Sequence, residues 1–186
     1  MDTVLEKLTE NVSAYEIMNH IIPGGVYLIL TDRFTSFTFL TEYILANIIL
    51  SYFAGVVIGR IGSIFIERTM QKIKSEKCGF FLSRAPYEDF VRAEAKDSEH
   101  KLQQLSAVNN MYRALASASL MLFLTILFDW GVSFIPAESI LRKIIILLVC
   151  LCLLFLFLFS FHKQTGYIRR RVEALNKSQT DEENKE

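Results

Sequence analysis

The residues of this 186-residue chain best suited to bind a metal or transfer a proton are three histidines, His20, His100 and His162. They lie far apart along the chain, so folding would have to bring distant segments together before they could share a metal ion. Arg92 and His100 fall on one expected helix, but a spacing of eight residues matches no recognised nuclease pattern. The motifs GxxxxGKS/T, HExxH and GxSxG do not occur. We therefore predict a protein that is not an enzyme, with no catalytic residue, cofactor or metal ligand.

The three cysteines do not form a reactive pair. Cys150 and Cys152 are separated by one residue, so on a helix their side chains point to different sides. With Cys78 they make neither a CxxC metal or redox site nor a disulfide framework. We expect them to act as small apolar side chains.

The elements that carry these residues are predicted to be membrane helices. Ile144 to Phe161 is an uncharged apolar run of eighteen residues, IIILLVCLCLLFLFLFSF. A helix crosses the hydrocarbon core of a bilayer with roughly 20 such residues, and a soluble fold of this size does not need a helix that is apolar on every face. The composition, 52% hydrophobic and 22% charged, fits a multi-pass membrane protein with sizeable aqueous segments.

Three weaker apolar runs predict three further spans, at Ile17–Thr31, Phe34–Gly59 and Ala114–Phe128. The fold class is then all-α, a polytopic membrane protein with four transmembrane helices and a cytosolic helical hairpin between spans 2 and 3. The first run also fits a segment that only dips into the membrane. Glu42 and Asp129 lie near the outer ends of their spans, where they can extend to the interface.

The distribution of Lys and Arg predicts the orientation. Four spans leave 17 of these residues on one side and 3 on the other, which puts both termini and the central loop in the cytosol. If the first run only dips into the membrane, the division is 16 to 4 and the N-terminus lies outside. The N-terminus lacks the basic stretch of a secretory signal, so we expect no cleavage.

Five segments follow from these patterns. They are an amphipathic N-terminal helix at 1–13, spans 1 and 2 at 14–66, a cytosolic helical loop at 67–113, spans 3 and 4 at 114–162, and a basic and then disordered cytosolic tail at 163–186, with disorder expected from Asn176. Within the loop we expect an irregular stretch from Cys78 to Ala85 and a new helix with Pro86 in its first turn. The loop is too short to hold a catalytic domain with its own core.

Small and polar residues recur every four positions along the second span: Asn47, Ser51, Gly55, Gly59 and Ser63. Such a stripe lets helix backbones approach closely in lipid, and Asn47 could add an interhelical hydrogen bond. Packing within one subunit and packing between subunits of a homo-oligomer both fit this pattern.

Pro23, Gly24 and Gly25 interrupt the first span, because proline removes one intrahelical hydrogen bond and glycines ease close packing or unwinding. The segment is predicted to be either a kink where a neighbour packs closely or a hinge beside a pore.

After the last span comes a basic run of Lys163, Arg169, Arg170 and Arg171. We expect these side chains to face membrane lipids, as anchors that contact anionic headgroups. No recognised nucleic-acid-binding fold accompanies them, so no direct nucleic-acid contact is predicted.

The layout of the whole chain resembles that of KwaA, the membrane component of Kiwa anti-phage defence systems. The resemblance is carried by the interrupted span at Asn19-His20-Ile21-Ile22-Pro23-Gly24, the charged loop from Glu67 to Arg113, and the basic run after the last span. It implies a homo-oligomeric inner-membrane sensor or scaffold that works with a cytosolic, DNA-binding partner similar to KwaB. No functional residue is carried over from the family.

Two other classes of function fit the same sequence. One is a homo-oligomeric channel or membrane-perturbing effector, in which Pro23–Gly25 and the small-residue stripe form or gate a pore. The other is a small transporter, which would need a deep acid, and Glu42 is poorly placed for that role.

Overall fold

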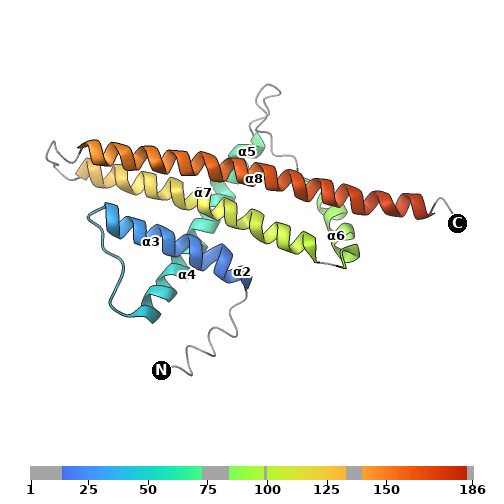
Figure 1. The fold of residues 1–186 in the computed structure, drawn as a ribbon, viewed down its shortest axis with the longest axis horizontal. Coiled ribbons are helices and arrows are strands. Elements are labelled where there is room, and N and C mark those ends of the chain that lie inside the picture. The colour runs from blue at the N-terminus through green and yellow to red at the C-terminus, as the bar shows by residue number, and fades with distance from the viewer. Residues whose placement is uncertain (1–13, 73–83, 99, 133–139, 184–186) are drawn as a thin grey trace.

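The computed structural model describes residues 14–72, 84–98, 100–132 and 140–183, and all the regular structure in these ranges is helical (Figure 1). The expected all-α class is therefore confirmed. Three helices in the described ranges are long and apolar enough to cross a membrane: Ile44–Met70, Lys101–Gly131 and Ile140–Lys177.

The longest two helices, α7 (Lys101–Val132) and α8 (Ile140–Glu183), lie side by side and run in opposite directions (Figure 1). Small side chains of α7 are buried in the bundle: Ala116 lies in one cluster with Phe161 of α8, and Ser117 lies against Gly62 of the neighbouring helical run. Helices in lipid gain little from apolar burial alone, so such small residues stabilise the pair by letting dispersion contacts form along both backbones. Phe161 of α8 is fully buried against Ala116.

The N-terminal helical run consists of α2 (Ala14–Glu16), the π-helical segment η1 (Ile17–Ile21) and α3 (Ile22–Phe34) without interruption. It lies along α7 (Figure 1). The hydroxyl groups of Tyr27 and Thr125 are 3.0 Å apart and form a hydrogen bond between α3 and α7.

A second continuous run, formed by α4 (Ile44–Ile61), the π-helical segment η2 (Gly62–Glu67) and α5 (Arg68–Lys72), packs on α3 and crosses α7 obliquely (Figure 1). One face of it is apolar and exposed: 64% of Phe53 and 61% of Phe65 are accessible. Such a face requires lipid or another protein surface to cover it.

The described part of the central loop contains one helix of its own. Helix α6 (Tyr87–Lys96) packs on the far part of α8, and α7 begins five residues after its end, at Lys101. Pro86 immediately precedes α6, with the extended angles φ −53° and ψ 145°, so it is not in the first turn. The N–H groups at the start of a helix have no partner within it, so the N–H that Pro86 lacks costs the helix no hydrogen bond.

Disorder from Asn176 was predicted, whereas α8 continues as a helix to Glu183. The part of α8 just before Asn176 is held by packing: Val172 is buried against Ala93 and Leu102, and Leu175 contacts the same cluster. A helix already formed by the span continues at little cost, since only the first turn carries the nucleation penalty. The predicted N-terminal helix at 1–13 and the stretch from Cys78 to Ser83 lie outside the described residues.

Candidate functional sites at a helix crossing and a polar platform

The predicted hinge at Pro23 is a continuous helix with a wider turn directly before it. The N–H of Ile22 donates to the carbonyl of Ile17, five residues back, which is the π-helical register. In an α-helical register the ring of Pro23 would press on the carbonyl of Asn19, so the wider turn relieves that contact. Pro23 and Gly24 are both buried.

Gly24 and Gly55 mark the point where α3 and α4 cross. A Cβ atom on Gly24 would overlap the carbonyl oxygen of Ser51 and the backbone nitrogen of Gly55. A Cβ atom on Gly55 would overlap the backbone of His20. The two backbones are therefore in direct contact, and the middle of the predicted stripe packs within one chain.

The other members of the stripe do not join this contact. No atom lies within 4 Å of the position of a Cβ on Gly59. The amide of Asn47 bonds Thr41 instead of another helix: its Oδ1 accepts from the Thr41 N–H at 2.8 Å and its Nδ2 donates to the Thr41 carbonyl at 2.8 Å. The predicted interhelical bond of Asn47 is thus wrong, because a polar side chain at a helix start satisfies the loop before it. Ser63 lies beyond the crossing, on η2.

Three helix ends are tied together by Asp129, which is only 3% exposed. Its carboxylate accepts a hydrogen bond from the backbone N–H of Ser36 at 3.0 Å and forms an ion pair with Nζ of Lys143 at 2.9 Å. Asp129 was expected to extend to the interface. The ion pair between Asp129 and Lys143 had a signal in the sequence that was overlooked. An acid ends the third apolar run, and a base directly precedes the fourth.

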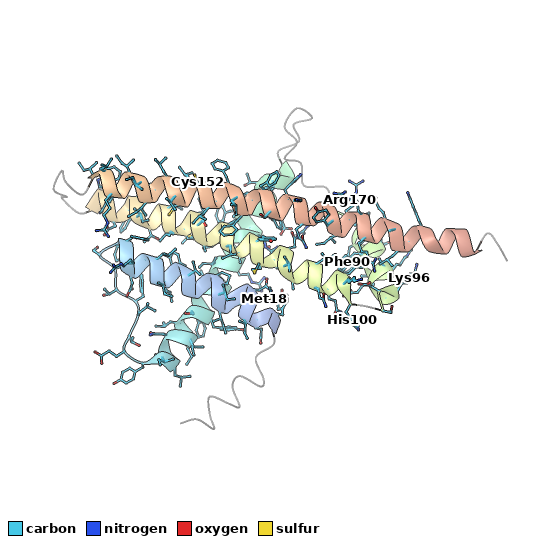
Figure 2. The ribbon with its side chains drawn as sticks, in the orientation of Figure 1. Met18, Phe90, Lys96, His100, Cys152 and Arg170 are labelled. Carbon is cyan, nitrogen blue, oxygen red and sulfur yellow. The ribbon has the colours of Figure 1, made fainter. Side chains whose placement is uncertain are left out.

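At the other end of the α7–α8 pair lies a small assembly of polar helices, here called the platform: α6, residues 101–112 of α7 and residues 162–177 of α8. Figure 2 shows Phe90, Lys96 and His100 together at this end, with Cys152 along the apolar part of α8. The core of the platform is Ala93, Leu102 and Val172, each at most 1% exposed. Because α6 contacts α8 through this core, the platform is one body with the last helix.

Asp97 holds the corner of the platform. Its carboxylate accepts from the backbone N–H of Leu102 at 2.5 Å, in the first turn of α7, and from Nη2 of Arg171 on α8 at 3.0 Å. The Leu102 N–H, followed by Arg171, lowers the pKa of the Asp97 carboxyl below its ordinary value of 3.8. A negative charge there also meets the positive end of the α7 dipole.

The basic residues of the run on α8 therefore have different contacts. Arg171 was predicted to face lipid, and this is wrong, because its guanidinium points at Asp97 across the platform. Arg169 pairs with Glu173 at 2.7 Å. Lys163 and Arg170 lie over the ring of Tyr167, 5.8 and 5.2 Å from its centroid. A basic side chain held over an aromatic ring is typical of an interface between apolar and aqueous surroundings.

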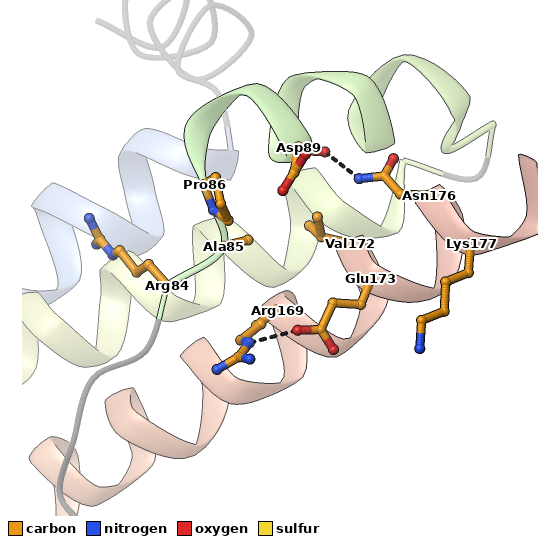
Figure 3. A pocket seen from close by; sticks show the side chains of 9 residues that line it. All are labelled: Arg84, Ala85, Pro86, Asp89, Arg169, Val172, Glu173, Asn176 and Lys177. Carbon is orange, nitrogen blue, oxygen red and sulfur yellow. Dashed lines mark hydrogen bonds and ion pairs between the residues drawn. The ribbon is translucent and has the colours of Figure 1, made fainter. Parts of the chain in front are cut away.

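A cleft of about 360 Å³ opens between the start of α6 and the far part of α8 (Figure 3). Charged side chains of both signs line it: Arg84, Asp89, Arg169, Glu173 and Lys177. Asn176 closes one side by donating from Nδ2 to the carbonyl of Asp89 at 3.0 Å. A surface with this mixture of charges suits recognition of a protein better than of a nucleic acid, which selects for positive charge.

Within the described ranges, no three His, Cys, Asp or Glu side chains come close enough together to hold a metal ion. No family model, curated protein or solved structure matches this chain. Its function is therefore argued from the geometry above.

We expect Gly55→Ala to destabilise the fold, because the new methyl group would collide with the rigid backbone at His20. The free energy of unfolding should fall by about 1–3 kcal/mol, the usual effect of overpacking. Unfolding in mixed micelles of sodium dodecyl sulfate, followed by the fluorescence of Trp130, measures it. Gly59→Ala is the matched control and should be neutral. Equal damage from both variants would contradict the crossing described here.

Asp97 predicts a dependence of platform stability on pH. Since its pKa is lower in the folded state than in the unfolded state, the carboxylate stabilises the platform above its ordinary pKa of 3.8, and this contribution is lost as the pH falls through the lowered folded value. Hydrogen exchange of the Leu102 amide, compared between neutral and acid conditions, reports it. Asp97→Ala, which removes the acceptor, should expose this amide already at neutral pH; equal protection in variant and parent would rule out the carboxylate as the holding group.

Proposed function

We propose that this protein is a non-enzymatic component of the inner membrane of a bacterium, a four-span and homo-oligomeric sensor or scaffold that presents its platform to a soluble cytosolic partner. The observation that carries the proposal is the continuity of α8. Its 44 residues extend about 66 Å at 1.5 Å per residue. The hydrocarbon core is only about 30 Å thick, so the same helix that crosses the membrane also forms the platform.

A fourth span is part of the proposal. The helical run from Ala14 to Phe34 has 21 residues, enough for about 32 Å. Its end is tied through Ser36 to Asp129 at the end of α7, and Asp129 is tied to Lys143 at the start of α8. Three helices that end at one level favour a common membrane surface there. The excess of Lys and Arg on the opposite side favours the cytosol for the platform and both termini.

Coupling between membrane and platform follows from the stiffness of helices. A tilt or shift of α8 within the lipid moves residues 162–177 with it, and α6 moves too because Ala93 is packed on Val172. Such a shift can report a change in the membrane, or in the neighbouring subunit, to whatever protein is bound at the platform.

The outer face of α6 is the surface that we assign to the partner. Tyr87, Val91 and Ala95 recur every four residues on it, and Tyr87 is 81% exposed. Phe90 and Ala93 occupy the other face, against α8. An exposed tyrosine with apolar neighbours is a frequent anchor in protein interfaces.

The defence context rests on the resemblance to KwaA alone. That resemblance adds the expectation that the soluble partner is a DNA-binding protein similar to KwaB. Homo-oligomer formation is supported by the apolar face of α4, where Ile49, Phe53 and Val57 are about half exposed or more in a single chain.

We expect the double variant Tyr87→Ser/Val91→Ser to lose the partner while the fold persists, since both side chains are exposed. Affinity should fall by about tenfold or more, as for an interface anchor. Tagged protein is purified in mild detergent from cells that carry its native operon, and the proteins bound are quantified by mass spectrometry. Arg92→Gln, an exposed residue of the same helix, is the control.

A soluble protein that co-purifies in fixed stoichiometry with the parent and with Arg92→Gln, but not with the double variant, would support the proposal. A clean homo-oligomer without any partner would contradict it. Ion flux from liposomes that contain that oligomer would then favour the channel or membrane-perturbing alternative.

A further inference from the structure

A second cleft lies between the helices of the bundle. It has a volume of about 400 Å³ and is bordered by η1, the run from α4 to η2, and α7. Both π-helical segments described above border it, through His20 on one side and Ser63 on the other. Such segments widen a helix locally and are found most often beside functional sites.

The polar atoms of this cleft are incompletely satisfied. Within the described residues, three buried atoms of side chains that line it have no hydrogen-bond partner: Oδ1 of Asn19, Nδ1 of His20 and Nε of Arg113. A buried polar group without a partner costs about 1–3 kcal/mol. Nδ1 of His20 and Nε of Arg113 can donate to an anionic ligand, whereas Oδ1 of Asn19 can only accept, so the two nitrogen atoms are the groups that an anionic ligand of this cleft would satisfy.

The charge of the cleft is positive. Arg60 and Arg113 line it, and the described lining includes no acidic side chain. Glu67 binds Nη1 of Arg113 at 2.6 Å and also pairs with Arg84, which fixes the Arg113 guanidinium in place. Arg60 is exposed, and no described acid lies within ion-pairing distance of it.

Aromatic and apolar surfaces adjoin the charged groups. Tyr15 and Tyr52 flank His20, with ring centroids 6.4 and 5.6 Å from the imidazole. Val56 lines the cleft, and the exposed Phe53 extends the apolar surface along the same helix. A site with cationic groups beside an exposed apolar helix face matches a molecule with an anionic head and an apolar tail.

We propose that this cleft binds a phosphate group, with the guanidinium groups of Arg60 and Arg113 as its charged ligands. The phosphate can come from the headgroup of an anionic phospholipid or from a soluble phosphate compound. Basic pockets between transmembrane helices on the cytosolic side commonly take anionic headgroups. This binding site does not depend on a protein partner at the platform. The orientation of the helices in the membrane decides only which leaflet supplies the lipid.

Two variants of the full chain test the site in different ways. Arg60→Gln removes its exposed charge, and Arg68→Gln, about two turns further along the same helix and also exposed, is the matched control. Gly59→Leu adds an apolar side chain to the lining of the cleft, and its Cβ atom meets nothing within 4 Å. The stability and oligomer size of each variant are measured first, so that loss of binding is not confused with unfolding.

Native mass spectrometry of the purified protein, titrated with dioleoylphosphatidylglycerol or dioleoylphosphatidylcholine, measures the preference for the anionic lipid. We expect the parent and Arg68→Gln to prefer phosphatidylglycerol, and Arg60→Gln and Gly59→Leu to bind it about tenfold or more weakly, the loss typical of one charge-assisted contact.

Inorganic phosphate separates the two sources. The cleft would be assigned to a soluble phosphate compound by two results together. Phosphate would stabilise the parent, but not Arg60→Gln, against thermal unfolding, and the parent would show no preference between the two lipids. Equal binding of both lipids together with no effect of phosphate would overturn the proposal. Equal weakening by Arg60→Gln and Arg68→Gln would overturn it as well, since it would show an effect of surface charge alone.

Discussion

The continuity of α8 is the constraint on which the rest of the structure depends. Its first half must be helical because lipid offers no hydrogen-bond partner to the backbone. Its second half is under no such requirement, yet α8 stays helical through Glu183. Within this half, α6 covers Val172 and Leu175. One helix therefore belongs both to the apolar bundle and to the polar platform, and the proposed transmission between them requires no additional linker.

Two kinds of contact attach the remaining elements to this helix. At one end, Asp129 joins the ends of α3, α7 and α8 through charge and hydrogen bonds. At the other, Asp97 joins the α6–α7 corner to Arg171. Between them the bundle is packed through small residues and through the glycine contact of α3 with α4. Both acids were visible in the sequence, but each gains its role from a residue on another helix.

Much of the architecture was predictable, because a bilayer limits a sequence to few solutions. Three of the four apolar runs correspond to helices long enough to cross it. The contact at Gly55 was foreseen as close packing, although the sequence did not tell whether its neighbour was the same chain. Arg171 was misassigned because its partner, Asp97, is 74 residues away and local charge patterns do not reveal such pairs.

The tail differs from its prediction for another reason. Disorder was predicted only from Asn176, where the sequence becomes polar, and the helical spacing of Ile168, Val172 and Leu175 just before it was not used. The polar cleft could not be found at all from the sequence, since His20, Arg60 and Arg113 come from three separate helical runs. Their residue types were conspicuous, whereas their proximity is a property of the fold alone.

Cysteine labelling tests directly whether the chain crosses the membrane four times, with the platform in the cytosol. Single cysteines at Ala14, Thr38 and Ser98, in a background without the natural cysteines, can be labelled with a membrane-impermeant maleimide in intact spheroplasts and after permeabilisation. Four spans predict that Thr38→Cys is labelled in intact spheroplasts, and that Ala14→Cys and Ser98→Cys are labelled only after permeabilisation. Labelling of Ala14→Cys in intact spheroplasts would contradict a fourth span, and labelling of Ser98→Cys there would contradict a cytosolic platform.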